Sequence, residues 1–415
     1  MIENTIKEIC LSAKEAAKAL ALASSELKNE VLLKAADNLI ADTDKILKAN
    51  AEDIKNLSPE KAHAFKDRLL LNEERIKAMA EGVRKVASLP DPVGRVLASW
   101  RVPSGLEISR VTIPLGVLCV IFEARPNVCA DAAALCFKAG SSVILRGGGD
   151  SFNSCLAIYD CFKKALEECS LPQGCINLVP SKDHEAVDIL LKQEDYIDVL
   201  IPRGGKKLIE KISQSRIPSF KHLNGICHTY IHKDADMEMA CKVLVNAKLR
   251  RTSICGATET VLLDKELGEA KIKQVLGALI ERGCEVRADE YIRSFMPDLP
   301  AAKGEDWGTE YLDAIISAKT VSCVKEAMEH IGKYGSNHTE SIITQDAQAA
   351  EEFLNGVNSA VVMHNTSTQF CDGGEFGMGA EIGIATGKLH ARGPVGLEQL
   401  VTFKYKVEGH GETRK

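Results

Sequence analysis

Apolar residues recur at helical spacing through the first 90 residues of the chain. Leu32, Ala36 and Leu39 lie three or four residues apart, and Ile46 continues the same face. The segment LPDPVGRV at 89–96 then interrupts this pattern with two prolines and a glycine. The pattern therefore predicts a helical N-terminal segment that ends near residue 90.

From about residue 100, strand-like and helix-like segments alternate. LEISRVTIP at 106–114 alternates polar and apolar residues, whereas GVLCVIFEA at 116–124 is an apolar run typical of a strand buried on both faces. Helix-like segments separate later strand-like runs, which indicates βαβ units and parallel sheets. A second alternation follows residues 230–236. We therefore expect an α/β protein with two lobes that divide there.

Composition narrows the classes of function without naming one. Of the 415 residues, 45% are hydrophobic and 27% are charged, and the net charge is −6, which disfavours nucleic acid or a membrane as a partner. No segment reaches the roughly 20 apolar residues of a membrane span, and no export signal is recognisable. These features predict a cytoplasmic protein whose 14 cysteines are thiols. No two cysteines form a CxxC pair, so we expect no bound metal.

Three glycine-rich turns follow predicted strands, at 145–150 (LRGGGD), 202–207 (PRGGKK) and 373–379 (GGEFGMG). The first two lead into helices, where backbone N–H groups and the helix dipole can hold a phosphate, with Arg146 or Lys206 adding positive charge. Neither turn has the GxGxxG spacing of a dinucleotide fingerprint. A tight connection between a strand and a helix, without a ligand, is the competing interpretation.

The segment FEARPNV at 122–128 follows a buried strand, and ligands bind at the carboxyl ends of parallel strands. Its polar residues Glu123, Arg125 and Asn127 are therefore candidates for a binding site. The guanidinium of Arg125 can bind a carboxylate or a phosphate with two hydrogen bonds. The alternative is an ordinary loop in which Asn127 makes a local turn.

Cys255, in LRRTSICGATET at 249–260, lies on a connection between a predicted helix and a predicted strand. The neighbouring cations Arg250 and Arg251 would lower a thiol pKa, and Gly256 allows a ligand to approach closely. A buried structural thiol is the competing interpretation. Cys227, in LNGICHTY, is a rival nucleophile because histidines flank it, although its strand-like setting favours core packing.

Several motifs occur in an order that resembles one family. They are PLGVLCVIFEARPNV, VILRGG, HLNGICH, NAKLRRTSICGATET, KYGSNHTESIIT and GAEIGIATGKLHARGPVGLEQLVTFKY. From about residue 5 to 408 the chain is similar to the gamma-glutamyl phosphate reductases, also called glutamate-5-semialdehyde dehydrogenases, of the aldehyde dehydrogenase superfamily. The resemblance implies two Rossmann-like lobes, one nucleotide-binding (1–235) and one catalytic (236–395). It also implies a small β element for oligomerisation, built from strands at about 98–113 and the C-terminal strand in 396–415.

The resemblance further implies an activity. The expected enzyme reduces L-glutamyl 5-phosphate with NADPH, and it releases glutamate 5-semialdehyde and phosphate in proline biosynthesis. The expected assembly is a homodimer or a higher homo-oligomer, and glutamate kinase is a possible partner because the substrate is labile. NADPH rather than NADH is expected from the resemblance alone, since no residue identifies itself as a ligand of the 2′-phosphate.

The resemblance also assigns roles to individual residues. It implies Cys255 as the nucleophile that forms a thioester and Asn127 as an oxyanion donor. The implied cofactor-binding residues are Arg146, Gly204, Gly205 and Glu310, and the implied substrate-binding residues are Arg125 and His338.

One absence separates this chain from aldehyde dehydrogenases that make free acids. Those enzymes carry a general base, usually a glutamate, in the segment that here reads KHLNGICH (221–228), where the aligned residue is His222 and no carboxylate is present. A thioester on Cys255 should therefore react with hydride or phosphate and only poorly with water. Gly256 and Asn224 depart from the asparagine and aspartate associated with many members.

Two other readings stay open at this point. One is an aldehyde dehydrogenase that acts on another acyl phosphate or semialdehyde. The other is a nucleotide-binding scaffold without activity. The roles of Arg250 and Arg251 are also open, because they can simply pack on the preceding helix.

Overall fold

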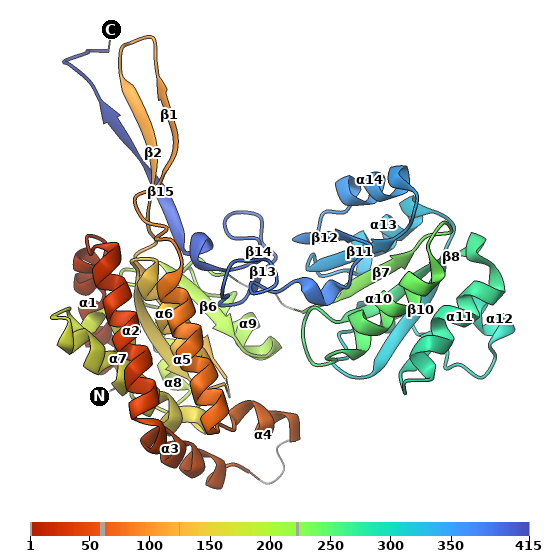
Figure 1. Cartoon of the computed structure of the whole chain (residues 1–415), viewed down its shortest axis with the longest axis horizontal. Coiled ribbons are helices and arrows are strands. Elements are labelled where there is room, and N and C mark those ends of the chain that lie inside the picture. The colour runs from red at the N-terminus through yellow and green to blue at the C-terminus, as the bar shows by residue number, and fades with distance from the viewer. Residues whose placement is uncertain (1, 59–62, 124, 221–223, 415) are drawn as a thin grey trace. The chain divides into compact units, whose positions relative to one another are not determined.

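The computed structural model describes residues 2–58, 63–123, 125–220 and 224–414. The chain forms two compact units, unit 1 (1–221, 377–383 and 395–415) and unit 2 (222–376 and 384–394), and each is built around a parallel sheet (Figure 1). The division falls earlier along the chain than the expected 230–236. The reason is strand β7 (Cys227–Ile231), which pairs in parallel with two strands of the second sheet.

Unit 1 begins with helices, as the spacing of apolar residues predicts. They are α1 (Ile2–Leu20), α2 (Ser25–Ala41), α3 (Thr43–Lys55), α4 (His63–Leu69) and α5 (Glu73–Ser88). Polar caps fix two of their starts, because Ser24 accepts a hydrogen bond from the backbone of Leu27 and Asn72 accepts one from Arg75. The last helix ends just before the two prolines at 90 and 92.

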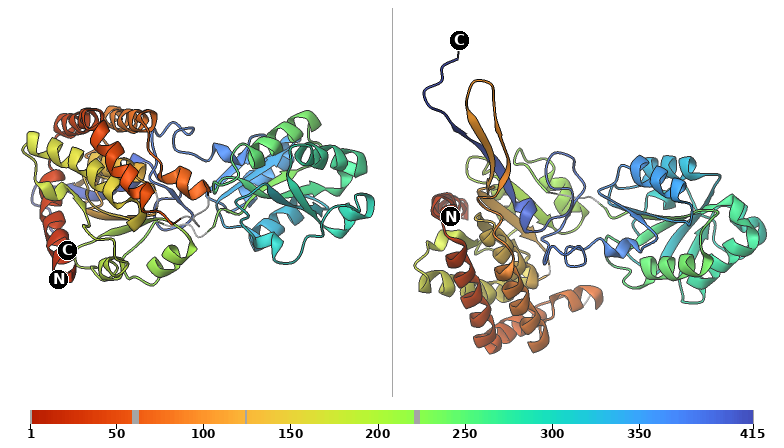
Figure 2. Two further views of the ribbon diagram at one scale, coloured as in Figure 1. Left: turned by 90° about the horizontal axis from the view of Figure 1, so that it is seen from below. Right: turned by 45° about the horizontal axis from the view of Figure 1, so that its top comes forward.

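The first sheet has four parallel strands in the order β5-β4-β3-β6. Its elements are β3 (Val117–Phe122), α6 (Asn127–Lys138), β4 (Ser142–Gly147), α7 (Phe152–Glu168), β5 (Ile176–Leu178), α8 (Glu185–Leu190), β6 (Val199–Arg203) and α9 (Lys206–Ile212). Alternate side chains of β3, such as Cys119 and Ile121, pack against α1, α8 and α9. The other face lies under α6 and α7, with α2, α3 and α5 outside them (Figure 2). Every residue of β3 is buried, which explains its continuous apolar sequence.

The second sheet has six parallel strands in the order β12-β11-β7-β8-β10-β9. The strands other than β7 are β8 (Thr258–Asp264), β9 (Glu285–Ala288), β10 (Ile315–Val321), β11 (Thr339–Ile343) and β12 (Val361–His364). The helices are α10 (Met237–Leu249), α11 (Gly268–Ile280), α12 (Glu290–Phe295), α13 (Val324–Tyr334) and α14 (Ala347–Gly356). The first three of these helices cover the face with Ile231 and Val261, and the other two cover the face with Tyr230 and Leu262.

Distant parts of the chain form a third, antiparallel sheet in unit 1. Strands β1 (Val96–Arg101) and β15 (Val401–Glu408) pair on either side of β2 (Glu107–Pro114). This sheet extends away from the helices of unit 1 (Figure 1). It is the small β element expected from about 98–113 and the C-terminal strand, and its role in oligomerisation stays a prediction.

The remaining elements are short. Unit 2 contains the strand pair β13 (Ile384–Ala385) and β14 (Gly393–Pro394). The 3-10 turns are η1 (Gly149–Ser151), η2 (Gln173–Cys175), η3 (Lys265–Leu267), η4 (Asp306–Gly308), η5 (Thr368–Phe370) and η6 (Leu397–Leu400). Among the described residues, no helix combines the length and the apolar character that crossing a membrane requires.

Candidate active site

Cys255 lies in the connection between α10 and β8, at the amino end of β8, and it is half-buried. The next residue, Gly256, is tightly packed, because Thr368 donates its hydroxyl hydrogen to the Gly256 carbonyl at 2.6 Å. A Cβ at this position would lie 3.2 Å from the Thr368 carbonyl oxygen. An asparagine at 256, as in many members of the resembled family, would therefore need the segment with Thr368 to shift.

Cys227, the rival thiol, contacts the backbone of Cys255. Its side chain is fully buried, and its Sγ donates to the Cys255 carbonyl oxygen at 3.1 Å. Burial raises the pKa of the Cys227 thiol well above its ordinary value, so it carries almost no thiolate at neutral pH. This environment suits a structural support, as its strand-like sequence predicts, and it favours Cys255 as the nucleophile.

His338 is part of the same support. Its side chain is fully buried, and Nδ1 lies 2.9 Å from the Thr339 hydroxyl and 3.6 Å from Cys227 Sγ. This placement favours a role beneath the Cys255 loop. Contact between His338 and a substrate stays a prediction.

Glu310 reaches the same loop through Gly225. The carboxylate accepts a hydrogen bond from the Gly225 backbone at 2.8 Å, and partial burial raises its pKa. Gly225 in turn lies against Cys255, since a Cβ there would be only 2.1 Å from the Cys255 carbonyl oxygen. The predicted cofactor-binding carboxylate and the predicted nucleophile are thus joined through one glycine.

The side chains of Arg250 and Arg251 are exposed. Arg250 Nε donates to the Gln369 side chain at 2.9 Å, and the Gln369 amide donates to the Ala247 carbonyl at 2.8 Å. Arg250 therefore fastens η5 to the end of α10, close to the packing role left open by the sequence.

In unit 1, Arg146 lies at the carboxyl end of β4 and is 3% exposed. Its Nη2 donates to the carbonyls of Lys182 at 3.3 Å and Asp183 at 2.9 Å. Its Nε is buried and has no hydrogen-bond partner among the described residues. A buried donor without a partner at this edge of a parallel sheet is what a phosphate or ribose oxygen of a bound nucleotide would satisfy.

Gly204 and Gly205 form the turn between β6 and α9. The Gly205 N–H donates to the Glu123 carboxylate at 3.2 Å, and a Cβ on Gly204 would be 2.8 Å from the Glu123 carboxyl carbon. A larger residue at 204 would therefore require the side chains of Glu123 and Leu208 to move. A phosphate could use the Gly205 N–H only after Glu123 moves aside, so the cofactor role of both glycines stays a prediction.

Asn127 is exposed at the first position of α6. Its amide donates to the Asp131 carboxylate at 3.1 Å, and burial raises the pKa of Asp131 to about 6. An amide nitrogen carries two hydrogens. Asp131 therefore fixes which end of the amide is the donor and leaves the second N–H for another acceptor. Arg125 is half-buried just before this helix.

The predicted residues thus form two groups. Unit 1 contributes Arg125, Asn127, Arg146, Gly204 and Gly205, and unit 2 contributes Cys255, Glu310 and His338. His222 lies outside the described residues.

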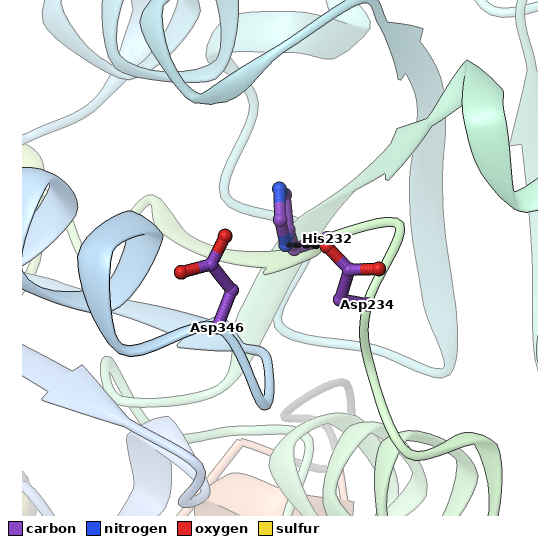
Figure 3. Close-up of side chains that lie close together, drawn as sticks. All are labelled: His232, Asp234 and Asp346. Atoms are coloured by element: carbon purple, nitrogen blue, oxygen red, sulfur yellow. Dashed lines mark ion pairs between the residues drawn. The ribbon is translucent and has the colours of Figure 1, made fainter.

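A group of potential metal ligands lies elsewhere in unit 2, at the carboxyl edge of its sheet (Figure 3). Ligand atoms of His232, Asp234 and Asp346 lie within 4.8 Å of one another. However, His232 Nδ1 is hydrogen-bonded to the Thr344 hydroxyl at 2.9 Å, and Asp346 caps α14. These contacts within the protein account for the group, so we assign no metal to it.

The α/β fold with two parallel sheets is that of the aldehyde dehydrogenase class, and the aldehyde dehydrogenase family model matches residues 2–287. A gamma-glutamyl phosphate reductase of Rhodospirillum rubrum is 53% identical over 415 residues, which are 100% of this chain and 97% of that protein. A second, from Paramagnetospirillum magneticum, is 52% identical over 97% of this chain and 96% of that protein. The crystal structure of one from Thermotoga maritima matches with a TM-score of 0.97 at 38% identity, over 99% of this chain and 100% of that chain. The chain belongs to the gamma-glutamyl phosphate reductases.

Sequence reasoning missed three residues that shape this site. Gly225 was visible only as one glycine of a motif. Lys248 and Glu259 form a fully buried ion pair on either side of Cys255. The available signal was a pair of charged residues inside otherwise apolar segments, one near a helix end and one in a strand.

Proposed function

We propose that this chain catalyses the NADPH-dependent reduction of L-glutamyl 5-phosphate to L-glutamate 5-semialdehyde and phosphate, through a thioester on Cys255, and that it serves proline biosynthesis. The observation that carries the proposal is the half-buried Cys255, supported from below by buried groups. It occurs in a chain whose relatives over full length are named for this reduction.

The chemistry asks for a nucleophile and for oxyanion donors. An acyl phosphate is an activated carboxyl derivative, so a thiolate at Cys255 can displace phosphate and form a thioester. The backbone N–H of Cys255 and the second N–H of Asn127 are the proposed oxyanion donors, and one such donor is typically worth about 3–4 kcal/mol. When bound, the nicotinamide supplies the hydride that reduces the thioester. Collapse of the resulting hemithioacetal returns Cys255 as a thiol.

Arg146 and Glu310 are the residues proposed to hold the nicotinamide dinucleotide. The buried Nε of Arg146 is a donor without a partner, and the Glu310 carboxylate can accept hydrogen bonds from a ribose. Arg125 is proposed to bind an anionic group of the substrate. The segment 221–228 has no carboxylate to activate water, which supports reduction over hydrolysis of the thioester.

We also propose that the chain assembles with copies of itself through the β1-β2-β15 sheet. Among the described residues, the outer strands β1 and β15 each pair on one side only, and Trp100, Phe403 and Tyr405 on them are 41%, 44% and 56% exposed. Open edges with exposed aromatic residues are surfaces that a second chain would cover.

The reverse reaction gives a direct test. The purified protein is mixed with pyrroline-5-carboxylate, phosphate and NADP⁺, and NADPH is followed by absorbance. Phosphate-dependent NADPH formation is expected, and its absence from folded protein would favour the scaffold. In the forward direction, glutamate kinase supplies L-glutamyl phosphate in situ. Oxidation of NADPH only with another acyl donor would overturn the substrate assignment.

Variants at the two thiols test the nucleophile. Cys255→Ala and Cys255→Ser should abolish turnover and leave cofactor binding close to that of the parent protein, because a serine hydroxyl is a far poorer nucleophile at neutral pH. Activity in Cys255→Ala together with none in Cys227→Ala would identify Cys227 as the reactive thiol.

A further inference from the structure

A buried ion pair joins the two ends of the loop that carries Cys255. Lys248 near the end of α10 and Glu259 in β8 are 11 residues apart, with Cys255 between them. Both side chains are 0% exposed, and Lys248 Nζ lies 2.5 Å from Glu259 Oε2. The pair therefore fixes the separation between the two ends of the nucleophile loop.

The same pair also contacts the segment that follows Glu310. The second oxygen of Glu259 accepts a hydrogen bond from the Leu312 backbone at 3.3 Å. Lys248 Nζ lies 5.8 Å from the centre of the Tyr311 ring, in a cation–π arrangement. Two consecutive residues after the proposed ribose ligand are thus held by the charges that close the Cys255 loop.

Leu312 has a backbone conformation that needs such a restraint. Its φ is +55°, in the left-handed region that a leucine rarely adopts, and its side chain is 42% exposed. Because the side chain is only partly buried, its packing does not fully offset this backbone strain. The hydrogen bond from its N–H to Glu259 is a described contact that restrains this conformation.

We propose that Lys248 and Glu259 are positioning residues for the reaction, forming a clamp that sets the Cys255 loop and the Glu310 segment in one fixed arrangement. This inference rests on the proposed function, in which Cys255 is the nucleophile and Glu310 holds the cofactor. A buried ion pair contributes little net stability compared with apolar residues of similar volume. Its directional bonds to three segments, by contrast, specify a geometry that apolar packing would not.

The test replaces the pair as a whole, because removing one partner would leave a buried charge and could unfold the protein. Lys248→Met/Glu259→Leu replaces both charged side chains by apolar ones of similar volume. It also removes the carboxylate oxygen that accepts the hydrogen bond from the Leu312 N–H. The matched control is Lys28→Met/Asp91→Asn, which removes the ion pair of unit 1 between the buried Lys28 and the half-buried Asp91, whose atoms are 2.6 Å apart. Four quantities are measured on each full-length protein: thermal unfolding, kcat, the affinity for NADP⁺, and the rate at which iodoacetamide alkylates Cys255, read by mass spectrometry.

If the pair acts as this clamp, Lys248→Met/Glu259→Leu should fold but lose catalytic activity and cofactor affinity. Its kcat should fall by about 100-fold, the effect of misplacing a reacting group by about 1 Å. Its affinity for NADP⁺ should weaken, and alkylation of the loosened Cys255 should accelerate several-fold. The Lys28→Met/Asp91→Asn control should keep the parent alkylation rate. Parent-like alkylation and cofactor affinity in Lys248→Met/Glu259→Leu would overturn the proposal.

A third change separates positioning from general stability. Glycine adopts a positive φ without strain, so Leu312→Gly added to the Lys248→Met/Glu259→Leu variant should recover part of the NADP⁺ affinity. If the pair served only stability, this added glycine would weaken binding further, and that result would overturn the clamp. The alkylation rate requires no substrate. Inactivity of the parent enzyme toward L-glutamyl phosphate would therefore count against the proposed function and leave the clamp to be judged by the alkylation result.

Discussion

The contact between Gly225 and the Cys255 backbone makes Gly225→Ala a severe test of how Cys255, the proposed nucleophile, is held. The added Cβ would lie 2.1 Å from the Cys255 carbonyl oxygen and 2.5 Å from its Cα. Non-bonded atoms settle at about 3.5 Å or more, so one backbone must move by roughly 1 Å or more. Both partners are backbone, and no side-chain rotation can relieve the overlap.

The expected consequences are quantitative. Overpacking of this kind costs about 1–3 kcal/mol of stability, and a displacement of about 1 Å at a reacting group can cost about 100-fold in rate. The assay is kcat in the reverse direction, together with thermal unfolding. Gly277→Ala is the matched control, because a Cβ at this position in α11 has no heavy atom within 4 Å. Gly277→Ala should keep the parent kcat. Its free energy of unfolding should rise by about 0.5–1 kcal/mol, because alanine replaces a glycine inside a helix. A Gly225→Ala enzyme as active as Gly277→Ala would refute the argument that this contact holds the thiol.

Three further outcomes follow from the contacts of single residues. Burial raises the pKa of Asp131 from 3.8 to about 6, so its contribution to stability is complete below about pH 4 and is lost as the pH rises through about 6. Asp131→Asn should therefore gain stability relative to the parent protein across this range in urea titrations, and a constant difference would contradict the shift. Glu310→Gln keeps an acceptor for the Gly225 N–H and loses the charge, so initial rates should show a higher KM for NADPH, whereas an unchanged KM would remove Glu310 from the cofactor site. Tyr405→Glu places a charge on an exposed edge strand, so size-exclusion chromatography should show a smaller species, and an unchanged elution volume would place the interface elsewhere.

The alternation of apolar runs was sufficient to predict the layered α/β fold. A strand such as β3, buried along its whole length, has a continuous apolar sequence, and the helices before residue 90 show their spacing directly. The place of β7 could not be read in this way. Its five residues are all buried, as are those of β3 and β4 in the first sheet and of β8 and β11 in the second. Only its parallel pairing with β8 and β11 assigns it to unit 2.

The candidate site residues could be proposed from the sequence where they lie in a motif, whereas contacts between distant parts of the chain could not. Cys255 could be singled out from its loop and its surrounding motifs. The hydrogen bond from Gly205 to Glu123 joins residues 82 positions apart, and the one from Gly225 to Glu310 joins residues 85 apart. Such pairings depend on which strand ends lie side by side, and no local spacing encodes them.

General rules about parallel sheets would have placed the proposed nucleophile at the other edge of its sheet. Ligands usually bind beyond the carboxyl ends of the strands, and Arg146 in unit 1 follows this rule. Cys255 lies instead at the amino end of β8, as Gly225 does for β7 and His338 for β11. In the described part of unit 2, helices α10, α11, α13 and α14 each follow a strand and therefore begin on the side of its carboxyl end. The position of the thiol must then come from groups packed beneath it, and a buried thiol, a glycine contact and a buried ion pair are the groups that unit 2 provides.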